Sequence, residues 1–356
     1  MNIAVYISGH GFGHLAQMAP VLNRLHQIRP DITFLLRCAL PKDEMHSRLH
    51  FPFELEASPV DVGVIQKNAV EEDRHASIML MRAWIKQMEA HIQRECDLMR
   101  AFQPCLIISD ISPLAFPTAK ALGIPGIGLA TLDWHSIYAH WLDADDEIIT
   151  TLAEAYGQCD LLLTPPMSMH MPVFPTQQQI PLIATAANSI TNPVTADARK
   201  KALVLFGGCG NPPYEMQALE EMHAWQFLIP DVDHHVAADL PDNVQPIRFS
   251  ADLRPVDMMP HVDVVLCKPG YGVLSECWVT ATPIAWVERP DFPEFPMLKE
   301  WLERSFPACG ISRSDFQSGQ WQPALDTALI HSSPFPDHED GAIEAVDIIL
   351  SYAPRA

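Results

Sequence analysis

The sequence has no pair of cysteines separated by two residues, although it contains eight cysteines among 356 residues. Zinc knuckles and thioredoxin-type redox sites need that spacing, so neither kind of site is indicated. Several cysteines lie in apolar runs, as Cys267 does in VVLCKPG. We therefore expect buried free thiols in a reducing compartment.

Basic residues are scarce, since 23 lysines and arginines stand against 44 acidic residues, for a net charge of −21. Nucleic acids and anionic membranes both attract a positive protein surface. The composition therefore predicts no nucleic-acid partner and favours a soluble ligand that is uncharged or cationic. A simpler explanation is also open, because acidity by itself keeps a protein soluble.

Long hydrophobic runs are missing as well. No stretch approaches the ~18 apolar residues of a membrane span. The first residues, MNIAVYISGHG, lack the basic region and the long apolar core of a signal peptide. We expect no stable membrane insertion and a cytoplasmic location.

What the sequence does contain is an alternation of short apolar runs with helical patterns, which predicts parallel β-α-β units. Residues 76–102 give the clearest helical pattern. The predicted strands are 3–7, 32–37, 106–109, 126–130 and 161–164, then, after a proline-rich stretch, 202–206, 225–229, 244–247, 262–267 and 282–287.

This pattern predicts an α/β protein with two doubly wound domains in tandem. The expected division is residues 1–190, residues 191–338, and a last amphipathic helix within 339–356 that returns to the first domain. Ligands of such folds bind at the carboxyl ends of the strands. Residues that directly follow a predicted strand are therefore the candidates for a site.

The turn after the first strand contains three alternate glycines and two histidines, as Gly9-His10-Gly11-Phe12-Gly13-His14. A dinucleotide fingerprint would need a glycine where His14 stands. The second strand ends in Arg37 rather than in an acid, which leaves an NADP enzyme open. Zinc binding by His10 and His14 is also open, although no third ligand is evident nearby.

Asp110 ends the predicted strand 106–109 in the sequence IISD. An acid at a strand end can orient a histidine and stabilise its protonated form, so we expect it to work with His14. The alternative is that Asp110 caps the helical segment beginning at Pro113.

The sequence KPGYGVLSE at 268–276 follows the apolar strand 262–267 and opens a predicted helix. Backbone N–H groups at such a turn bind phosphate well. Lys268 adds positive charge, and Glu276 can accept both hydroxyls of a ribose. A second glycine turn, Gly207-Gly208, follows the first strand of the second half. An ordinary capped turn is the alternative for 268–276.

Together these motifs resemble GT-B glycosyltransferases, which implies two Rossmann-like doubly wound domains facing across a cleft. GHGFGH, SDISP, Asp133-Trp134, KPGYGVLSE and Glu294-Phe295-Pro296 are most similar to the transferase-like half of L-arabinokinase-type proteins and to related bacterial glycosyltransferases. The likeness keeps the same order along most of the chain.

The resemblance implies an inverting transfer of a sugar from a nucleotide-diphosphate sugar, with a UDP-sugar favoured, to a hydroxyl of an unidentified acceptor. His14 would be the general base, and Asp110 would orient it. No metal or further cofactor is expected; Asp231-Val232-Asp233 is the one Asp-x-Asp match. The residues expected to bind the donor are Gly207, Gly208, Lys268, Gly270, Tyr271, Gly272, Ser275, Glu276, Asp291 and Glu294.

The chain also departs from the plant-type transferases. Lys268 replaces their histidine, and Gly272-Val273 replaces their Asn-Ser, so two side-chain contacts to phosphate are absent. Two other functions remain open: a nucleotide-sugar epimerase or hydrolase of the same fold, and a non-catalytic sugar-nucleotide-binding protein.

Overall fold

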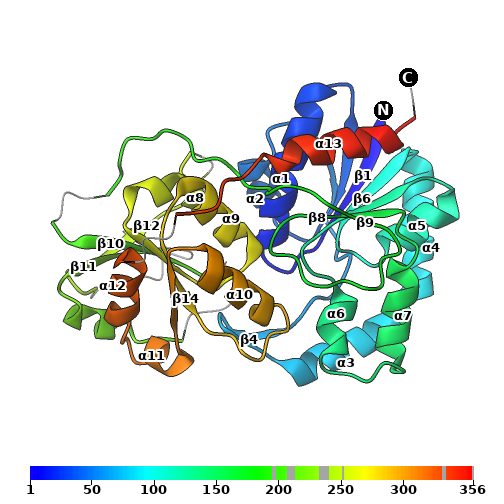
Figure 1. Ribbon diagram of the computed structural model, residues 1–356. Coiled ribbons are helices and arrows are strands. Elements are labelled where there is room, and N and C mark those ends of the chain that lie inside the picture. Colours follow the sequence, from blue (N-terminus) through cyan, green and yellow to red (C-terminus); the bar gives the residue numbers. More distant parts are fainter. Residues whose placement is uncertain (195–197, 207–212, 232–239, 251, 331–333, 355–356) are drawn as a thin grey trace. The chain divides into compact units, whose positions relative to one another are not determined.

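The computed structural model describes residues 1–194, 198–206, 213–231, 240–250, 252–330 and 334–354. These residues form two compact units. The N-terminal unit comprises residues 1–65, 73–184 and 338–356, and the C-terminal unit comprises 66–72 and 185–337. Figure 1 labels their helices and strands.

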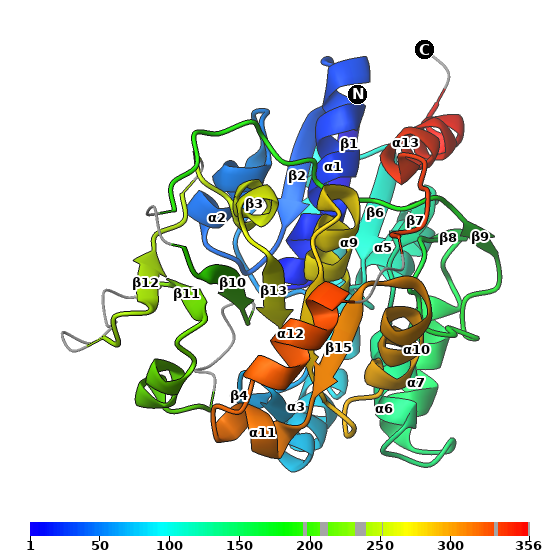
Figure 2. The same cartoon turned by 60° about the vertical axis from the view of Figure 1, so that its left-hand side comes forward.

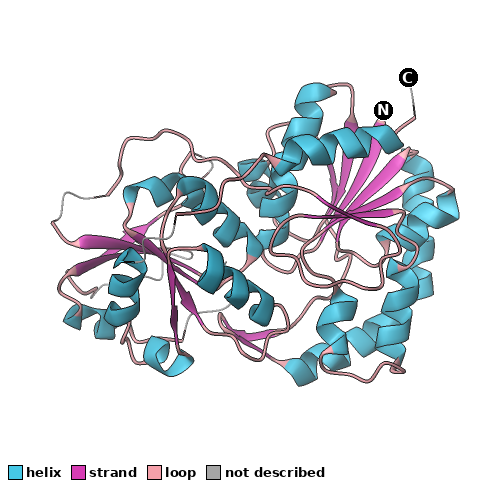
Figure 3. Cartoon of the chain, viewed as in Figure 1, coloured by secondary structure: helices cyan, strands magenta, loops and turns pink. Residues whose placement is uncertain are grey.

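The N-terminal unit is built on a seven-stranded parallel sheet with the order β3-β2-β1-β6-β7-β8-β9. Figure 3 shows its strands as a magenta fan. The central strands are apolar and almost fully buried, as expected when helices cover both faces. Its strands are β1 (Asn2–Ile7), β2 (Thr33–Arg37), β3 (Glu54–Glu56), β6 (Leu106–Asp110), β7 (Gly126–Leu129), β8 (Leu161–Thr164) and β9 (Gln177–Gln179).

Eight helices of the described chain accompany this sheet. They are α1 (Phe12–Ile28), α2 (Lys42–Arg48), α3 (Arg74–Ile85), α4 (Met88–Phe102), α5 (Ala115–Leu122), α6 (Trp134–Ala139), α7 (Glu147–Tyr156) and α13 (Gly341–Tyr352). The single helix predicted over 76–102 is in fact two, α3 and α4, separated at Lys86 and Gln87. Side-chain periodicity continues across such a break, so the sequence did not show it.

The last helix, α13, packs against α1 in the N-terminal unit. Its first residue, Gly341, donates its N–H to the carbonyl of Leu182 at 2.8 Å. A Cβ at Gly341 would come within 2.0 Å of the carbonyl oxygen of Pro181. Only glycine therefore lets the end of the chain approach this segment so closely.

The C-terminal unit has a six-stranded parallel sheet with the order β12-β11-β10-β13-β14-β15. Helix α12 contacts β13, β14 and β15. Figure 2 shows it in orange beside β13 and β15. Its strands are β10 (Lys200–Leu205), β11 (Trp225–Pro230), β12 (Val244–Ile247), β13 (Val264–Cys267), β14 (Ile284–Val287) and β15 (Ala308–Ile311). Its helices are η1 (Met216–Glu221), α8 (Pro255–Met258), η2 (Met259–His261), α9 (Tyr271–Thr280), α10 (Phe295–Ser305), α11 (Arg313–Gln317) and α12 (Gln322–Ile330).

One short segment from the first third of the chain, residues 66–72, belongs to the C-terminal unit. Strands β4 (Gln66–Asn68) and β5 (Glu71–Glu72) form an antiparallel hairpin, and its tip residues Ala69 and Val70 are fully buried in the core of that unit. The expected division into three consecutive ranges did not include it, because a seven-residue hairpin gives no clear periodic signal.

The cysteines of the described residues are all free, and most are buried; they are Cys38, Cys96, Cys105, Cys159, Cys267, Cys277 and Cys309. No helix in the described ranges combines the length and the apolar character needed to cross a membrane.

Candidate functional site

The structure brings His14 and Asp110 together at the carboxyl edge of the N-terminal sheet. Asp110 is the last residue of β6 and pairs in register with Ile7, the last residue of β1. The turn of Gly9, His10, Gly11 and Gly13 leads directly into α1, which carries His14 in its first turn. His14 Nδ1 lies 3.1 Å from Asp110 Oδ1.

Both side chains of this pair are buried, at 11% exposure for His14 and 2% for Asp110. Burial raises the pKa of Asp110, and the neighbouring His14 opposes that rise. Asp110 Oδ2 is buried without a hydrogen-bond partner among the described residues. Among the described residues the carboxylate bonds to His14, an arrangement that orients the imidazole and would stabilise its charge once it has taken up a proton.

A second acid, Asp61, belongs to this cluster and was not predicted. It is fully buried and accepts hydrogen bonds from Ser8 Oγ and Trp134 Nε1, each at 3.1 Å. Burial raises its pKa, whereas Trp134 and the charge of His14 oppose the rise. The sequence around Asp61 contains no motif, and only its hydrogen bonds to Ser8 and Trp134 and its electrostatic interaction with His14 reveal it.

His10 has a structural place in this cluster. Its ring packs edge-on against Trp134, with centroids 5.3 Å apart. Its Nδ1 accepts a hydrogen bond from the N–H of Val64 at 3.4 Å. Gly63 has a φ of +55° and a Cβ there would lie 2.7 Å from this nitrogen, so glycine is required beside the ring.

Among the described residues, the structure places no third zinc ligand beside His10 and His14. Within the ranges that the structure describes, no group of three histidine, cysteine or acidic side chains could hold a metal. Asp231 is described and accepts from Arg248 at 3.3 Å, whereas Asp233 lies outside the described residues.

Arg37 does not have the surroundings of a phosphate ligand. Its guanidinium is 5% exposed and donates through Nε to Glu95 at 2.8 Å, and Tyr6 donates to the same carboxylate at 2.9 Å. A buried pair of this kind commits Arg37 to the packing of β2 against α4, which removes the sequence argument for an NADP enzyme.

Asp133 is the N-cap of α6 and shows how strongly burial disfavours a charged carboxylate. Its side chain accepts from the N–H and the hydroxyl of Ser136 at 2.8 and 2.7 Å, yet burial raises its pKa from 3.8 to about 6. Because the pKa is raised in the folded state, its stabilising contribution is present below pH 4 and is lost as the pH rises through about 6.

We expect Asp133→Asn to be more stable than the parent above pH 6 by up to about 3 kcal/mol, because asparagine caps a helix equally well without the buried charge. The difference should shrink toward pH 4. Urea unfolding of both proteins at pH 4 and pH 7.5 measures it. A gap independent of pH would contradict the burial of a charged carboxylate at this position.

In the C-terminal unit, the predicted donor turn occupies the carboxyl end of β13. Lys268 follows the strand, and its N–H donates to the carbonyl of Leu205 at 3.2 Å. Gly270 is the N-cap of α9, whose first residues are Tyr271 and Gly272. A Cβ on Gly270 would meet no atom of the described residues within 4 Å.

The two polar residues further along α9 are buried. Ser275 donates its hydroxyl to the carbonyl of Gly272 at 3.0 Å, which fastens the first turn of the helix. Glu276 is 5% exposed and lies on the next turn. Gly207 and Gly208 lie outside the described residues, so their predicted role is not placed by the structure.

Asp291 and Glu294 lie on the loop between β14 and α10, but in different surroundings. Asp291 is exposed and pairs with Arg313 at 2.8 Å. Glu294 is buried and is the N-cap of α10. Between β14 and these acids, Arg289 forms a buried ion pair with Glu72 of the β4–β5 hairpin.

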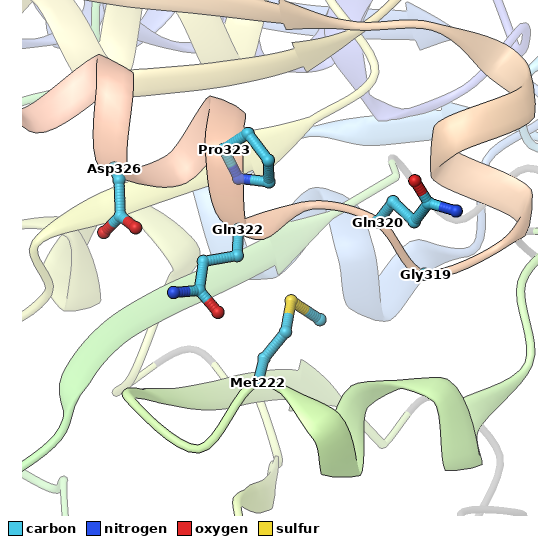
Figure 4. Close-up of a pocket in the computed structure, with 6 residues that line it drawn as sticks. All are labelled: Met222, Gly319, Gln320, Gln322, Pro323 and Asp326. Atoms are coloured by element: carbon cyan, nitrogen blue, oxygen red, sulfur yellow. The ribbon is translucent and has the colours of Figure 1, made fainter.

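A separate depression in the C-terminal unit contains none of the predicted site residues (Figure 4). One of its lining residues, Asp326, pairs with Lys200 at the start of β10. The depression therefore lies toward the amino ends of the strands, opposite to the edge that carries the donor turn. Its lining residues are Met222, Gly319, Gln320, Gln322, Pro323 and Asp326.

The chain matches no model of a known protein family. It is 26% identical over 347 residues to L-arabinokinase of Arabidopsis thaliana, a match that covers 92% of this chain but spans only 32% of that protein's length. The solved glycosyltransferase of kitacinnamycin is similar over 99% of both chains, with a TM-score of 0.63 at 13% identity. Spinosyn rhamnosyltransferase SpnG covers 99% of this chain, and this chain 96% of it, with a TM-score of 0.62 at 15% identity. These likenesses show that the chain has the GT-B glycosyltransferase fold.

Proposed function

We propose that this chain, with its GT-B fold, is an inverting glycosyltransferase that moves a sugar from a nucleotide-diphosphate sugar to a hydroxyl of an acceptor. The observation that carries the proposal is the 3.1 Å contact between His14 and Asp110 at the carboxyl edge of the N-terminal sheet. A buried histidine oriented by a buried acid is suited to take a proton from a hydroxyl.

In the proposed reaction, His14 removes the proton of the acceptor hydroxyl as its oxygen attacks the anomeric carbon of the donor. With Nδ1 engaged by Asp110, the nitrogen that takes the proton is Nε2. Asp110 stabilises the resulting imidazolium. The C–O bond to the diphosphate breaks on the opposite side of the sugar, so the anomeric configuration inverts.

The donor is assigned to the turn at 268–272 and to α9 of the C-terminal unit. N–H groups at a helix N-terminus and the ammonium of Lys268 would stabilise the diphosphate as it leaves. Glu276 would accept the ribose hydroxyls. Spinosyn rhamnosyltransferase SpnG has been solved with thymidine diphosphate. A UDP-sugar remains our first choice, and dTDP-sugars belong in the same test.

We expect activity to persist in excess EDTA, because the proposed stabilisation of the leaving group uses backbone dipoles and Lys268 instead of a metal. Turnover measured with and without EDTA, after desalting, checks this. Loss of activity in EDTA with rescue by manganese would contradict the mechanism and direct attention to Asp231 and Asp233.

For the acceptor, we propose a soluble molecule that is uncharged or cationic. The net charge of −21 should repel polyanions, most strongly at low salt.

A thermal-shift screen of UDP-, GDP-, dTDP- and CMP-sugars, with pentose donors included because of the likeness to L-arabinokinase, tests the function. A ligand that binds the folded state raises the midpoint temperature of unfolding. We therefore expect the sugar nucleotides of one base to raise this temperature more than the others do. Products formed without an acceptor then separate the alternatives, since release of free sugar indicates a hydrolase and an altered sugar nucleotide an epimerase. No shift with any sugar nucleotide would contradict the proposal.

A further inference from the structure

The β4–β5 hairpin is a preformed element of the C-terminal unit, although its chain neighbours belong to the N-terminal unit. Its base is closed by the N–H of Asp73, which donates to the carbonyl of Ile65 at 2.7 Å. Its turn is closed by Asn68 Oδ1, which accepts from the N–H groups of Val70 and Glu71 at 3.0 and 3.1 Å. Local hydrogen bonds thus fix its shape, and the buried tip anchors it in the core.

The hairpin contacts the C-terminal unit where β14 and β15 end. Arg289 follows β14 by two residues and donates to the carbonyl of Val70 at 3.4 Å and to Glu72 Oε2 at 3.3 Å. Arg313 follows β15 by two residues and lies 3.9 Å from Glu71. The hairpin therefore covers the same edge of the sheet that carries the donor turn after β13.

The ion pair between Glu72 and Arg289 is buried, with side chains 4% and 5% exposed. Burying two charges costs as much free energy as the pair returns, so an apolar contact would stabilise the fold at least as well. The pair is also incompletely bonded, because Glu72 Oε1 is buried without a partner in the described part of the chain. Native buried oxygens are usually bonded, and an exception calls for an explanation other than stability.

The position of Arg289 in the chain supplies that explanation. Between it and α10 lie only the few residues that include Asp291 and Glu294, two acids expected to bind the donor. The guanidinium of Arg289 also covers the ring of Phe292 in the same loop, 4.1 Å from its centroid. A carboxylate that fixes Arg289 therefore fixes the loop on which both acids lie.

We propose that Glu72 is a positioning residue of the donor-sugar subsite: by holding Arg289 it sets the loop 288–294 so that its acids accept hydroxyls of the transferred sugar. This inference rests on the proposed glycosyltransferase function. It makes recognition of the donor's sugar, but not of its nucleotide, depend on the β4–β5 hairpin, which lies in the first third of the chain.

The test compares the affinities of Glu72→Gln for the sugar nucleotide that gives the largest thermal shift and for its parent nucleoside diphosphate, both by calorimetry. The variant keeps the shape of the side chain but removes its charge. We expect about a ten-fold loss of affinity for the sugar nucleotide, the scale of one charge-assisted hydrogen bond, and little change for the nucleoside diphosphate.

Glu300→Gln is the matched control, since it removes a carboxylate of the same unit that lies on α10, is 68% exposed and pairs with the exposed Arg304. It should leave both affinities unchanged. If Glu72→Gln fails to fold, Arg289→Lys tests the same point, because its shorter reach loses the bond to Val70 and should change the same ratio.

An unchanged ratio of the two affinities in the folded variant would overturn the inference, and so would an equal loss of both. These results are distinct from failure of the proposed function, in which the unaltered protein would bind no sugar nucleotide. That outcome would remove the inference together with its premise.

Discussion

Replacing His14 with alanine is expected to lower turnover about 10²- to 10⁴-fold, the usual contribution of a general base. The effect should fall on turnover, with donor affinity nearly unchanged, because the residues assigned to the donor belong to the other unit. Steady-state rates with saturating donor, together with calorimetry of donor binding, separate the two quantities. Near-normal turnover in the variant would remove His14 from the mechanism.

Two companion variants sharpen this expectation. Asp110→Asn keeps the size of the side chain but cannot stabilise the imidazolium, so it should be slow while folded. His10→Ala removes the other histidine of the same turn, whose ring packs on Trp134 and accepts from Val64. It should cost far less turnover than His14→Ala. Equal losses would show that the turn's shape, rather than a base, is what matters.

Replacing Glu276 with alanine is expected to weaken binding of both the sugar nucleotide and the free nucleoside diphosphate, by about a hundred-fold or more. The variant loses two charge-assisted hydrogen bonds to the ribose, each worth roughly 1.5–3 kcal/mol before compensation. Calorimetry with both ligands measures the loss. Because the ribose is common to them, their affinities should fall together, unlike those of Glu72→Gln.

The control for this variant is Glu303→Ala, which removes a carboxylate that is 58% exposed on α10 of the same unit. It should leave both affinities as they are. Unchanged nucleotide affinity in Glu276→Ala would displace Glu276 from the ribose site and leave the turn at 268–272 without its assigned partner.

Sequence alone predicted most of the architecture, because the signals that set it are local. Continuous apolar runs predicted ten strands of the two sheets but not the edge strands β3, β9 and β15. The residues at the ends of β1, β6 and β13 were expected at the carboxyl edges of the sheets. His14 and Asp110 lie 96 residues apart in sequence, yet they could be paired in advance since parallel strands bring their ends to one edge.

Only the tertiary structure revealed the residues whose role depends on contacts between distant and irregular segments. Asp61 lies in a stretch without periodicity and became part of the cluster only through Ser8 and Trp134. The hairpin at 66–72 is too short for a pattern and owes its place to the burial of Val70 in the C-terminal core. Arg37 was a candidate ligand at a strand end, but in the structure it forms a buried ion pair with Glu95 of α4.

Hydrophobic periodicity and turn residues depend on neighbours that are close in the sequence, so they predict local structure. The partner of a buried charge depends on which polar groups leave water together, and that is decided only when distant segments pack in the folded chain.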